Sequence, residues 1–263
     1  MIKREFKVNL KSFIIWLSIL LIMFTLVYLI YPYIITDENI KNIDEMMKVF
    51  PPDVLKAFNM DMSSIATPYG WFKSEGFMFI LLIIGLYSSI LGGTILLREE
   101  NDKTIEYLAS LPIKRNTIIT NKIIVGLIYS ILIVLIFLIF NYIGLSLSCE
   151  FNHKEFILVS LTPILISLPL FSINLFISTF LHKTKKTPGI SLGLVFIFYI
   201  LNTLSEISTK VDFLKYFSIY SLVDIRNVIT KVEINPIMII ISISITILFL
   251  VGTYINYNKK ELV

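Results

Sequence analysis

Six long stretches of the chain consist of apolar and small polar residues and contain no Asp, Glu, Lys or Arg. A membrane-crossing helix needs about 20 predominantly apolar residues. Because backbone groups in lipid must bond within their own segment, such stretches fold as helices. The pattern predicts an all-α, polytopic membrane protein with a single transmembrane domain over residues 1–263. The predicted spans are 12–36, 76–97, 123–149, 156–181, 187–205 and 234–258.

Basic residues are distributed unevenly between the two sets of connecting segments. Four of them lie within residues 3–11, before the first span, and Lys259 and Lys260 follow the last span. If both termini are cytoplasmic, the inner segments carry 14 Lys and Arg, whereas the outer segments carry 9, together with 13 of the 19 Asp and Glu. Cytoplasmic loops carry the excess of Lys and Arg. We therefore predict that the N-terminus and the C-terminus are both cytoplasmic.

The two long segments predicted to face the outside are 37–75 and 206–233. In the first, apolar residues recur at helical spacing until Pro51 and Pro52, which favours a helical lid; a substrate-binding role is the alternative. Residues 67–71 (TPYGW) predict a turn with interfacial aromatic rings. The second segment is too apolar for a free loop and predicts one or two short helices at the outer leaflet.

Polar residues are few inside the predicted spans. Asn141, Asn174 and Asn202 predict hydrogen bonds between helices. Two prolines, Pro163 and Pro169, predict a kink in the fourth span.

Small residues recur in the second span, and Gly189 and Gly193 lie four apart in the fifth. Such spacing lets another helix approach closely. It indicates helix packing, either within the chain or across a dimer.

Several functions are disfavoured by what the sequence lacks. The predicted spans contain no ionisable acid, base or histidine of the kind that marks ion pathways, which argues against an ion-coupled carrier. His153 and His182 fall at opposite membrane faces and cannot form a metal pair. Cys149 is the only cysteine, so no internal disulfide forms, and no basic aromatic surface for nucleic acid is present. The chain also has no G-x-x-x-x-G-K-[ST] phosphate-binding loop, so nucleotide hydrolysis would need another chain.

A charged segment, 98–122, separates the second and third spans and is longer than a hairpin turn requires. It predicts a short amphipathic helix that has Ile105 and Leu108 on one face and ends at Pro112. We expect this helix to lie in the cytoplasm.

The pattern E-x-x-x-x-T-I-E-Y-L-x-S-L-P-I-x-R-x-x-I-x-x-x-K over residues 99–122 resembles the cytoplasmic segment of ABC-2 type exporter permeases. The basic N-terminus, the long outer loop and the six spans are also similar to that family. The resemblance implies a separate cytoplasmic ATP-binding subunit, which binds ATP and Mg, and a second permease subunit. Many members have glycine where this chain has Lys103, which is a departure from the family pattern at the start of the helix.

The resemblance also implies a site, namely a coupling helix that meets the ATP-binding subunit. We expect Ile105 and Leu108 to insert into a groove of that subunit, with charged residues at its rim. The candidate residues are Glu99, Glu100, Thr104, Ile105, Glu106, Leu108, Ser110, Leu111, Pro112, Lys114 and Arg115.

These observations predict the permease subunit of an ATP-driven exporter, without catalytic, cofactor or metal sites of its own. The uncharged spans favour an amphipathic or hydrophobic cargo such as a peptide, an antibiotic or a lipid-like molecule. The Ile-, Asn- and Lys-rich composition is typical of an AT-rich bacterial genome. We therefore expect the protein to lie in a bacterial plasma membrane, in contact with membrane lipid. An ion-coupled secondary carrier and a non-transporting membrane scaffold are the alternatives.

Overall fold

The computed structural model describes residues 2–34, 36, 41–42, 45, 48–50, 67–102, 114–207 and 209–260. Within these residues the regular structure is entirely helical, which confirms the all-α prediction. The long elements are α1 (Ile2–Ile34), α6 (Phe77–Ile95), α9 (Arg115–Ser148), α10 (His153–Leu161), α11 (Ile164–Ser178), α12 (Thr187–Ile207) and α14 (Pro236–Lys259). The short ones are α5 (Pro68–Trp71), η1 (Phe72–Gly76), α7 (Arg98–Asn101), η2 (Thr184–Lys186), η3 (Thr209–Phe217), η4 (Ile219–Leu222) and α13 (Ile225–Lys231).

Six helical stretches are long and apolar enough to cross a membrane, in agreement with the predicted number. Three of them begin well before the charge-free runs, because α1 includes the basic residues within 3–11, the second stretch begins at Pro68 and α9 begins at Arg115. Lys and Arg side chains at helix ends extend their charged groups toward water, so charge does not end a helix. The six stretches are Ile2–Tyr31, Pro68–Ile95, Arg115–Ser148, His153–Ser178, Thr184–Ile207 and Pro236–Lys259.

The second span begins at Pro68, and the predicted turn over residues 67–71 is wrong. Thr67 is extended and its side chain accepts a hydrogen bond from the backbone N–H of Gly70, while Pro68 occupies the first helical position. Thr caps and N-terminal prolines both favour a helix start. The helix continues through the π-helical turn η1 into α6. Most of the lid predicted within 37–75 lies outside the described residues.

The fourth span is divided, as its prolines predicted. α10 ends at Leu161, Thr162 and Pro163 form a turn, and α11 begins at Ile164. Pro169 lies inside α11.

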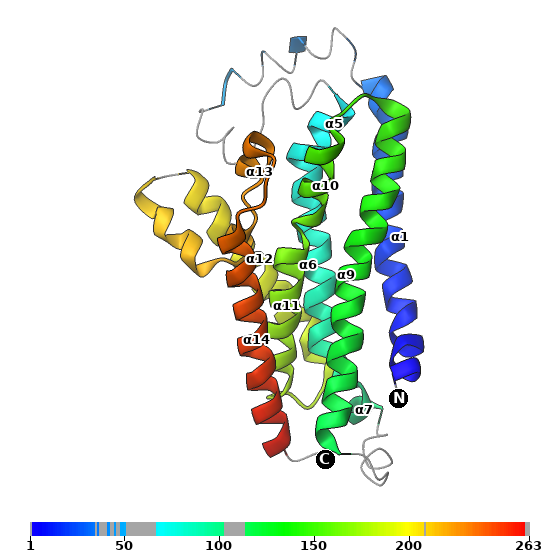
Figure 1. Ribbon diagram of the computed structural model, residues 1–263, viewed down its shortest axis with the longest axis vertical. Helices are drawn as coiled ribbons and strands as arrows, with labels where there is room; N and C mark the ends of the chain where they lie inside the picture. The colour runs from blue at the N-terminus through cyan, green and yellow to red at the C-terminus, as the bar shows by residue number, and fades with distance from the viewer. Residues whose placement is uncertain are drawn as a thin grey trace.

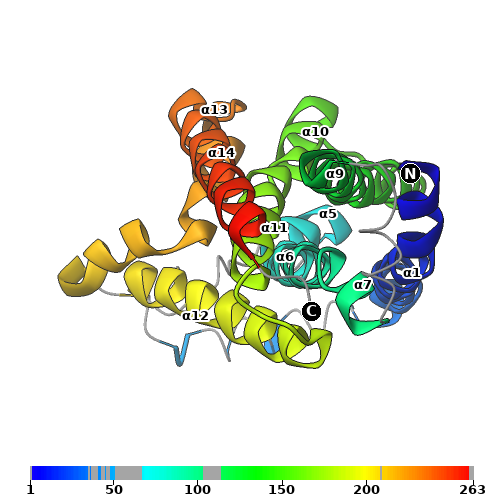
Figure 2. The same cartoon turned by 90° about the horizontal axis from the view of Figure 1, so that it is seen from below.

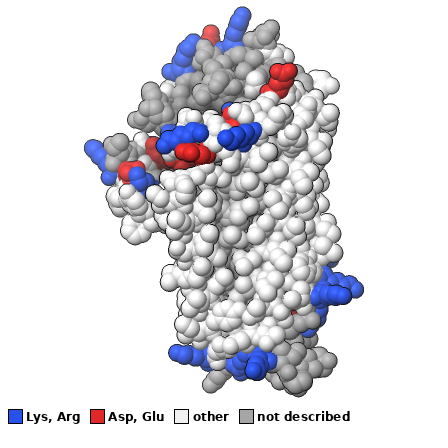
Figure 3. Space-filling model, in the orientation of Figure 1, with Lys and Arg blue, Asp and Glu red and all other residues white. Residues whose placement is uncertain are grey.

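The long helices form one bundle (Figure 1). The beginning of α1, the end of α14 and α7 lie together at one end, which we call the α7 end; α5 and the start of α10 mark the opposite, α5 end (Figure 1). Lys and Arg gather at the α7 end, while acidic and basic side chains mix near the α5 end (Figure 3). The two termini therefore share one side of the bundle, as an even number of spans requires.

α11 forms the centre of the bundle and packs most extensively against α6 and α14. Its approach to α6 depends on Gly92, where an added Cβ would overlap the backbone carbonyl of Phe171. Gly126 of α9 similarly leaves room for the Phe171 ring. These glycines show that close packing within the chain explains part of the small-residue pattern.

α12 lies at the edge of the bundle, where it packs against α6 (Figure 2). It pairs with η3, and the Ser218 hydroxyl donates to the carbonyl oxygen of Phe198 at 2.5 Å. η3, η4 and α13 are the short helices predicted within 206–233. By contrast with Gly92, a Cβ at Gly189 or Gly193 would meet nothing within 4 Å among the described residues.

Candidate functional site

The structure describes four of the predicted site residues, and they lie on both sides of the segment 103–113. Glu99 and Glu100 belong to α7, which directly follows α6, whereas Lys114 and Arg115 begin α9. The other seven, and with them the predicted coupling helix, lie outside the described residues: Thr104, Ile105, Glu106, Leu108, Ser110, Leu111 and Pro112.

A buried charge cluster lies directly before the segment 103–113. The Nζ of Lys122 on α9 is 2.6 Å from Glu99 Oε2 and 3.3 Å from Glu5 Oε2 on α1. It also donates to the carbonyl oxygen of Ile95, at the end of α6, at 2.7 Å. The three N–H donors of one ammonium therefore have three acceptors from three different elements. We call Glu5, Glu99 and Lys122 the triad.

The triad is almost entirely shielded from water. Lys122 is 1% exposed, Glu5 2% and Glu99 3%. Removing charges from water is costly, and their attraction offsets that cost only with good geometry and complete hydrogen bonding. Once formed, such a cluster strongly disfavours separation, because a lost partner leaves a buried charge unpaired. The triad thus connects α1, α6, α7 and α9.

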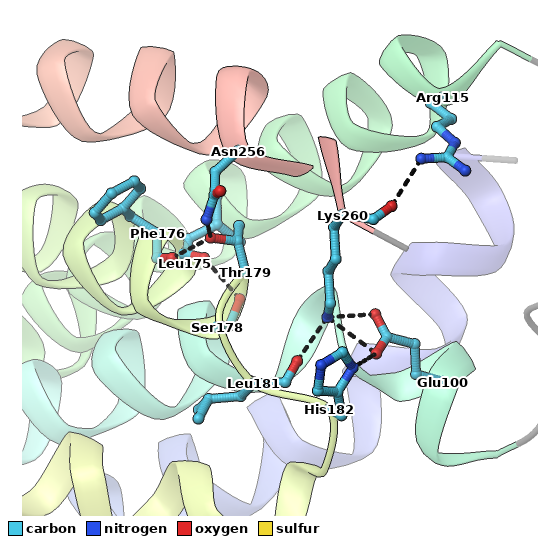
Figure 4. A network of polar contacts seen from close by, with 10 residues as sticks. All are labelled: Glu100, Arg115, Leu175, Phe176, Ser178, Thr179, Leu181, His182, Asn256 and Lys260. Carbon is cyan, nitrogen blue, oxygen red and sulfur yellow. Dashed lines mark hydrogen bonds and ion pairs between the residues drawn. The ribbon is translucent and has the colours of Figure 1, made fainter. Parts of the chain in front are cut away.

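A second network connects α7 to the end of α14 and to the turn between α11 and α12 (Figure 4). Glu100 accepts two hydrogen bonds from Nζ of Lys260, at 2.7 and 2.9 Å, and its carboxylate lies 3.6 Å from Nδ1 of His182. Lys260 also donates to the carbonyl oxygen of Leu181 at 2.6 Å. Glu100 is buried, although the His182 ring is largely exposed. α7, the end of α14 and the turn between α11 and α12 therefore converge on one carboxylate.

The residues that follow the segment 103–113 are also attached to α14. Arg115 donates from Nη1 to the carbonyl oxygen of Lys260 at 2.9 Å (Figure 4). One residue on, Asn116 accepts from Asn258 at 2.7 Å. Lys114 precedes the helix in an extended conformation and is exposed. Both boundaries of the segment 103–113 are thus fixed to the bundle.

Polar groups in the middle of the bundle form a neutral network between α6, α11 and α12. Asn174 Nδ2 donates to Ser89 Oγ at 2.5 Å, and Ser191 Oγ donates to Asn174 Oδ1 at 3.0 Å. Asn141 accepts from Tyr28 of α1 at 2.5 Å. These contacts confirm interhelical hydrogen bonding for two of the three predicted asparagines. Asn202 instead donates to Glu206 of its own helix.

Sequence reasoning identified Glu99 and Glu100 but not their partners. It placed Lys122 at the boundary of the third span and both glutamates at the rim of a protein interface. The structure instead gives these carboxylates partners within the chain. These partners were missed because Glu5 and Lys260 are remote from α7 in sequence. The one local sign of a buried charge cluster was Glu5, an acidic residue within the basic N-terminal stretch.

Metal-binding clusters do not occur in the part of the chain that the structure describes: it contains no group of three or more His, Cys, Asp and Glu suited to a metal ion. His153 begins α10 near the α5 end and His182 lies at the α7 end, as predicted.

A comparison with protein families matches residues 1–262 to a family described as ABC-2 family transporter protein. Searches of curated proteins and of solved structures give no significant match. The family match spans nearly the whole chain and agrees with six candidate membrane spans. This chain therefore belongs to the ABC-2 family of transporter proteins and is a multi-pass, transmembrane permease.

Proposed function

We propose that this permease is the transmembrane subunit of an exporter driven by a separate cytoplasmic subunit that binds ATP and Mg. The observation that carries the proposal is the position of the segment 103–113 between two sets of polar attachments, which are buried before the segment and exposed after it. Glu99 and Glu100 hold the residues before it, and Arg115 holds those after it. A force applied to this segment would be transmitted through these attachments to α1, α6, α9 and α14.

The proposed coupling is a transition between two conformations. When ATP closes the pair of ATP-binding subunits, each subunit displaces the segment 103–113, whose predicted apolar face includes Ile105 and Leu108. The triad passes this motion to α1, α6 and α9, and the Glu100–Lys260 pair passes it to α14 and the α11–α12 turn. Rigid helices can then move as units between inward-facing and outward-facing arrangements.

Co-purification tests the proposed partner. The full chain, tagged and solubilised in mild detergent from its native cells, should retain a protein with a phosphate-binding loop and ATPase activity. The expected complex hydrolyses ATP, and cargo stimulates its turnover. A purified permease that transports cargo without any ATPase would contradict the proposal and favour an ion-coupled carrier. If the chain shows neither transport nor a bound ATPase, it is a scaffold.

We propose a second permease copy, or a homologous permease, along α12. The open face of this helix carries Gly189 and Gly193 beside exposed Leu192 and Phe196, so a neighbouring helix could approach closely. In a Cys149→Ser background, Phe196→Cys should cross-link between subunits. Ile247→Cys, on the exposed face of α14, is the matched control. Equal cross-linking at both positions would contradict the α12 interface.

The proposed cargo is amphipathic or hydrophobic, and its direction of transport is outward. The support is the neutral Asn174–Ser89–Ser191 network at the middle of the bundle, where the described spans offer no unpaired charge to an ionic cargo. Deletion of the gene should increase sensitivity to one or more peptides, antibiotics or lipid-like toxins. Unchanged sensitivity across a broad panel, with unchanged cellular retention of labelled compounds, would contradict this cargo class.

The proposal also places the α7 end in the cytoplasm of a bacterial cell, with the bundle in the plasma membrane. The concentration of Lys and Arg at that end supports this orientation (Figure 3).

A further inference from the structure

An open groove of about 480 Å³ lies between α1 and α7, and its lining includes no residue of the triad. α1 contributes a face that includes Lys11, Ser12 and Trp16, and α7 contributes Arg98, followed by Asp102. The remaining lining is apolar, from Val8 and Ile15. The groove therefore combines polar and apolar walls at the level where basic residues begin the first span.

Among the residues that the structure describes, the cations of this groove have no hydrogen-bond or ion-pair partner. Nη1 of Arg98 is buried and makes no hydrogen bond, and neither Arg98 nor Lys11 has an ion pair among the described residues. Asp102 also lines the groove, where its Oδ1 accepts from Asn101 at 3.3 Å rather than pairing with Arg98. Two cations and one anion leave the lining with net positive charge. A half-buried guanidinium without an acceptor is costly. Arg98 lines the groove, so an acceptor held there would stabilise its charge.

An apolar strip continues from the groove along α1. Ile15, Ile19, Ile22 and Leu26 recur at helical spacing and are each between 46% and 59% exposed. They lead away from the α7 end, toward the middle of the bundle. A ligand that filled both the cationic groove and the apolar strip would carry an anionic oxygen group and a long hydrocarbon chain.

We propose that this groove binds the headgroup phosphate of an anionic phospholipid from the leaflet at the α7 end. Arg98 and Lys11 would donate to the phosphate oxygens, Ser12 would add a hydroxyl, and one acyl chain would follow the α1 strip. Arg suits phosphate because its planar guanidinium presents paired donors. Trp16 is placed where aromatic rings favour the membrane interface.

The proposal predicts selective quenching of Trp16 by lipid with brominated acyl chains. The chain has two tryptophans, so Trp71→Phe leaves Trp16 as the sole reporter. In full-length protein reconstituted in phosphatidylcholine nanodiscs, brominated phosphatidylglycerol should show an apparent affinity about tenfold higher than brominated phosphatidylcholine. Lys11→Gln with Arg98→Gln should abolish that preference.

Lys185→Gln with Lys186→Gln is the matched control, because it removes the same charge from the α7 end outside the groove. The control should keep the tenfold preference. Equal quenching by the two lipids, or an equal loss in the control, would overturn the site. Displacement of phosphatidylglycerol by millimolar inorganic phosphate would show a site for free phosphate and overturn the lipid assignment. Should Trp71→Phe not fold, native mass spectrometry of phosphatidylglycerol bound to the same two double variants, with Trp71 retained, makes the comparison.

Discussion

The two ends of the bundle are held together by different physical means. At the α7 end, the triad and the Glu100–Lys260 pair are buried ionic contacts between helices distant in sequence. At the α5 end, the main ion pair is Lys73–Glu155, whose side chains are 23% and 12% exposed, beside packed rings that include Tyr69 and Phe156. Water reaches the partly exposed Lys73 more readily than Lys122, so it competes more strongly for the pair at the α5 end. The α7 end is therefore fastened in one arrangement, whereas ring packing at the α5 end tolerates small shifts.

The largest expected effect is at Lys122. Lys122→Met leaves Glu5 and Glu99 buried without a cation, so we expect a loss of about 3–5 kcal/mol in the free energy of unfolding. Denaturant unfolding in detergent micelles, followed by tryptophan fluorescence, measures the loss. Adding Glu5→Gln and Glu99→Gln should restore part of the stability, because no net charge is then buried. A Lys122→Met protein as stable as the wild type would show that the triad does not fasten this end.

Glu100→Gln should have an intermediate effect. The change keeps the side-chain size but removes the charge that Lys260 binds, with an expected cost of about 1.5–3 kcal/mol. Asp212→Asn, in the exposed Lys215–Asp212 pair, is the matched control and should cost less than about 1 kcal/mol. Cargo-stimulated ATP turnover of the complex should fall in Glu100→Gln alone. Equal behaviour of the two variants would remove the special role of Glu100.

At the α5 end, Lys73→Met should lower stability by about 1–3 kcal/mol, less than Lys122→Met, because it leaves one largely buried carboxylate, Glu155, without its cation, whereas Lys122→Met leaves two. The same unfolding assay measures it alongside Lys122→Met. A loss as large as that at Lys122 would contradict the distinction between the two ends.

Labelling of Cys149 measures which side of the membrane the α5 end faces, and it has no expected effect on stability. It follows α9 at the α5 end, so an impermeant maleimide should label it in intact cells if that end faces outside. Burial raises the pKa of the Cys149 thiol, so less reactive thiolate is present at neutral pH. Labelling should accordingly be slow at pH 7 and accelerate through the alkaline range. Labelling that requires permeabilised cells would reverse the proposed orientation.

Much of the fold was predictable because lipid imposes a simple rule, an apolar run of sufficient length for each crossing. The division of the fourth span followed from Pro163. The helical start at Pro68 did not, because TPYGW suits either a turn or a capped helix, and the sequence alone does not show that the helix continues into α6.

The site was predictable only in part. The charged segment and its family pattern predict where a partner binds, and helical spacing selects Ile105 and Leu108 as its contacts; both stay predictions. The partners of Glu99 and Glu100 depend on tertiary contacts with Glu5, Lys122 and Lys260, which no local pattern encodes. Because the spans were defined as runs without charged residues, Lys122 was placed at the boundary of the third span, and its burial was not predicted.

The most direct test of coupling is the cargo-stimulated ATP turnover of the purified complex carrying Leu108→Asp. Leu147→Asp is the matched control, since it makes the same change at an exposed position at the opposite end of α9. We expect Leu108→Asp to insert normally and lose stimulation, while Leu147→Asp retains it. Normal stimulation and transport in Leu108→Asp would contradict the claim that the segment between α7 and α9 couples ATP hydrolysis to the membrane helices.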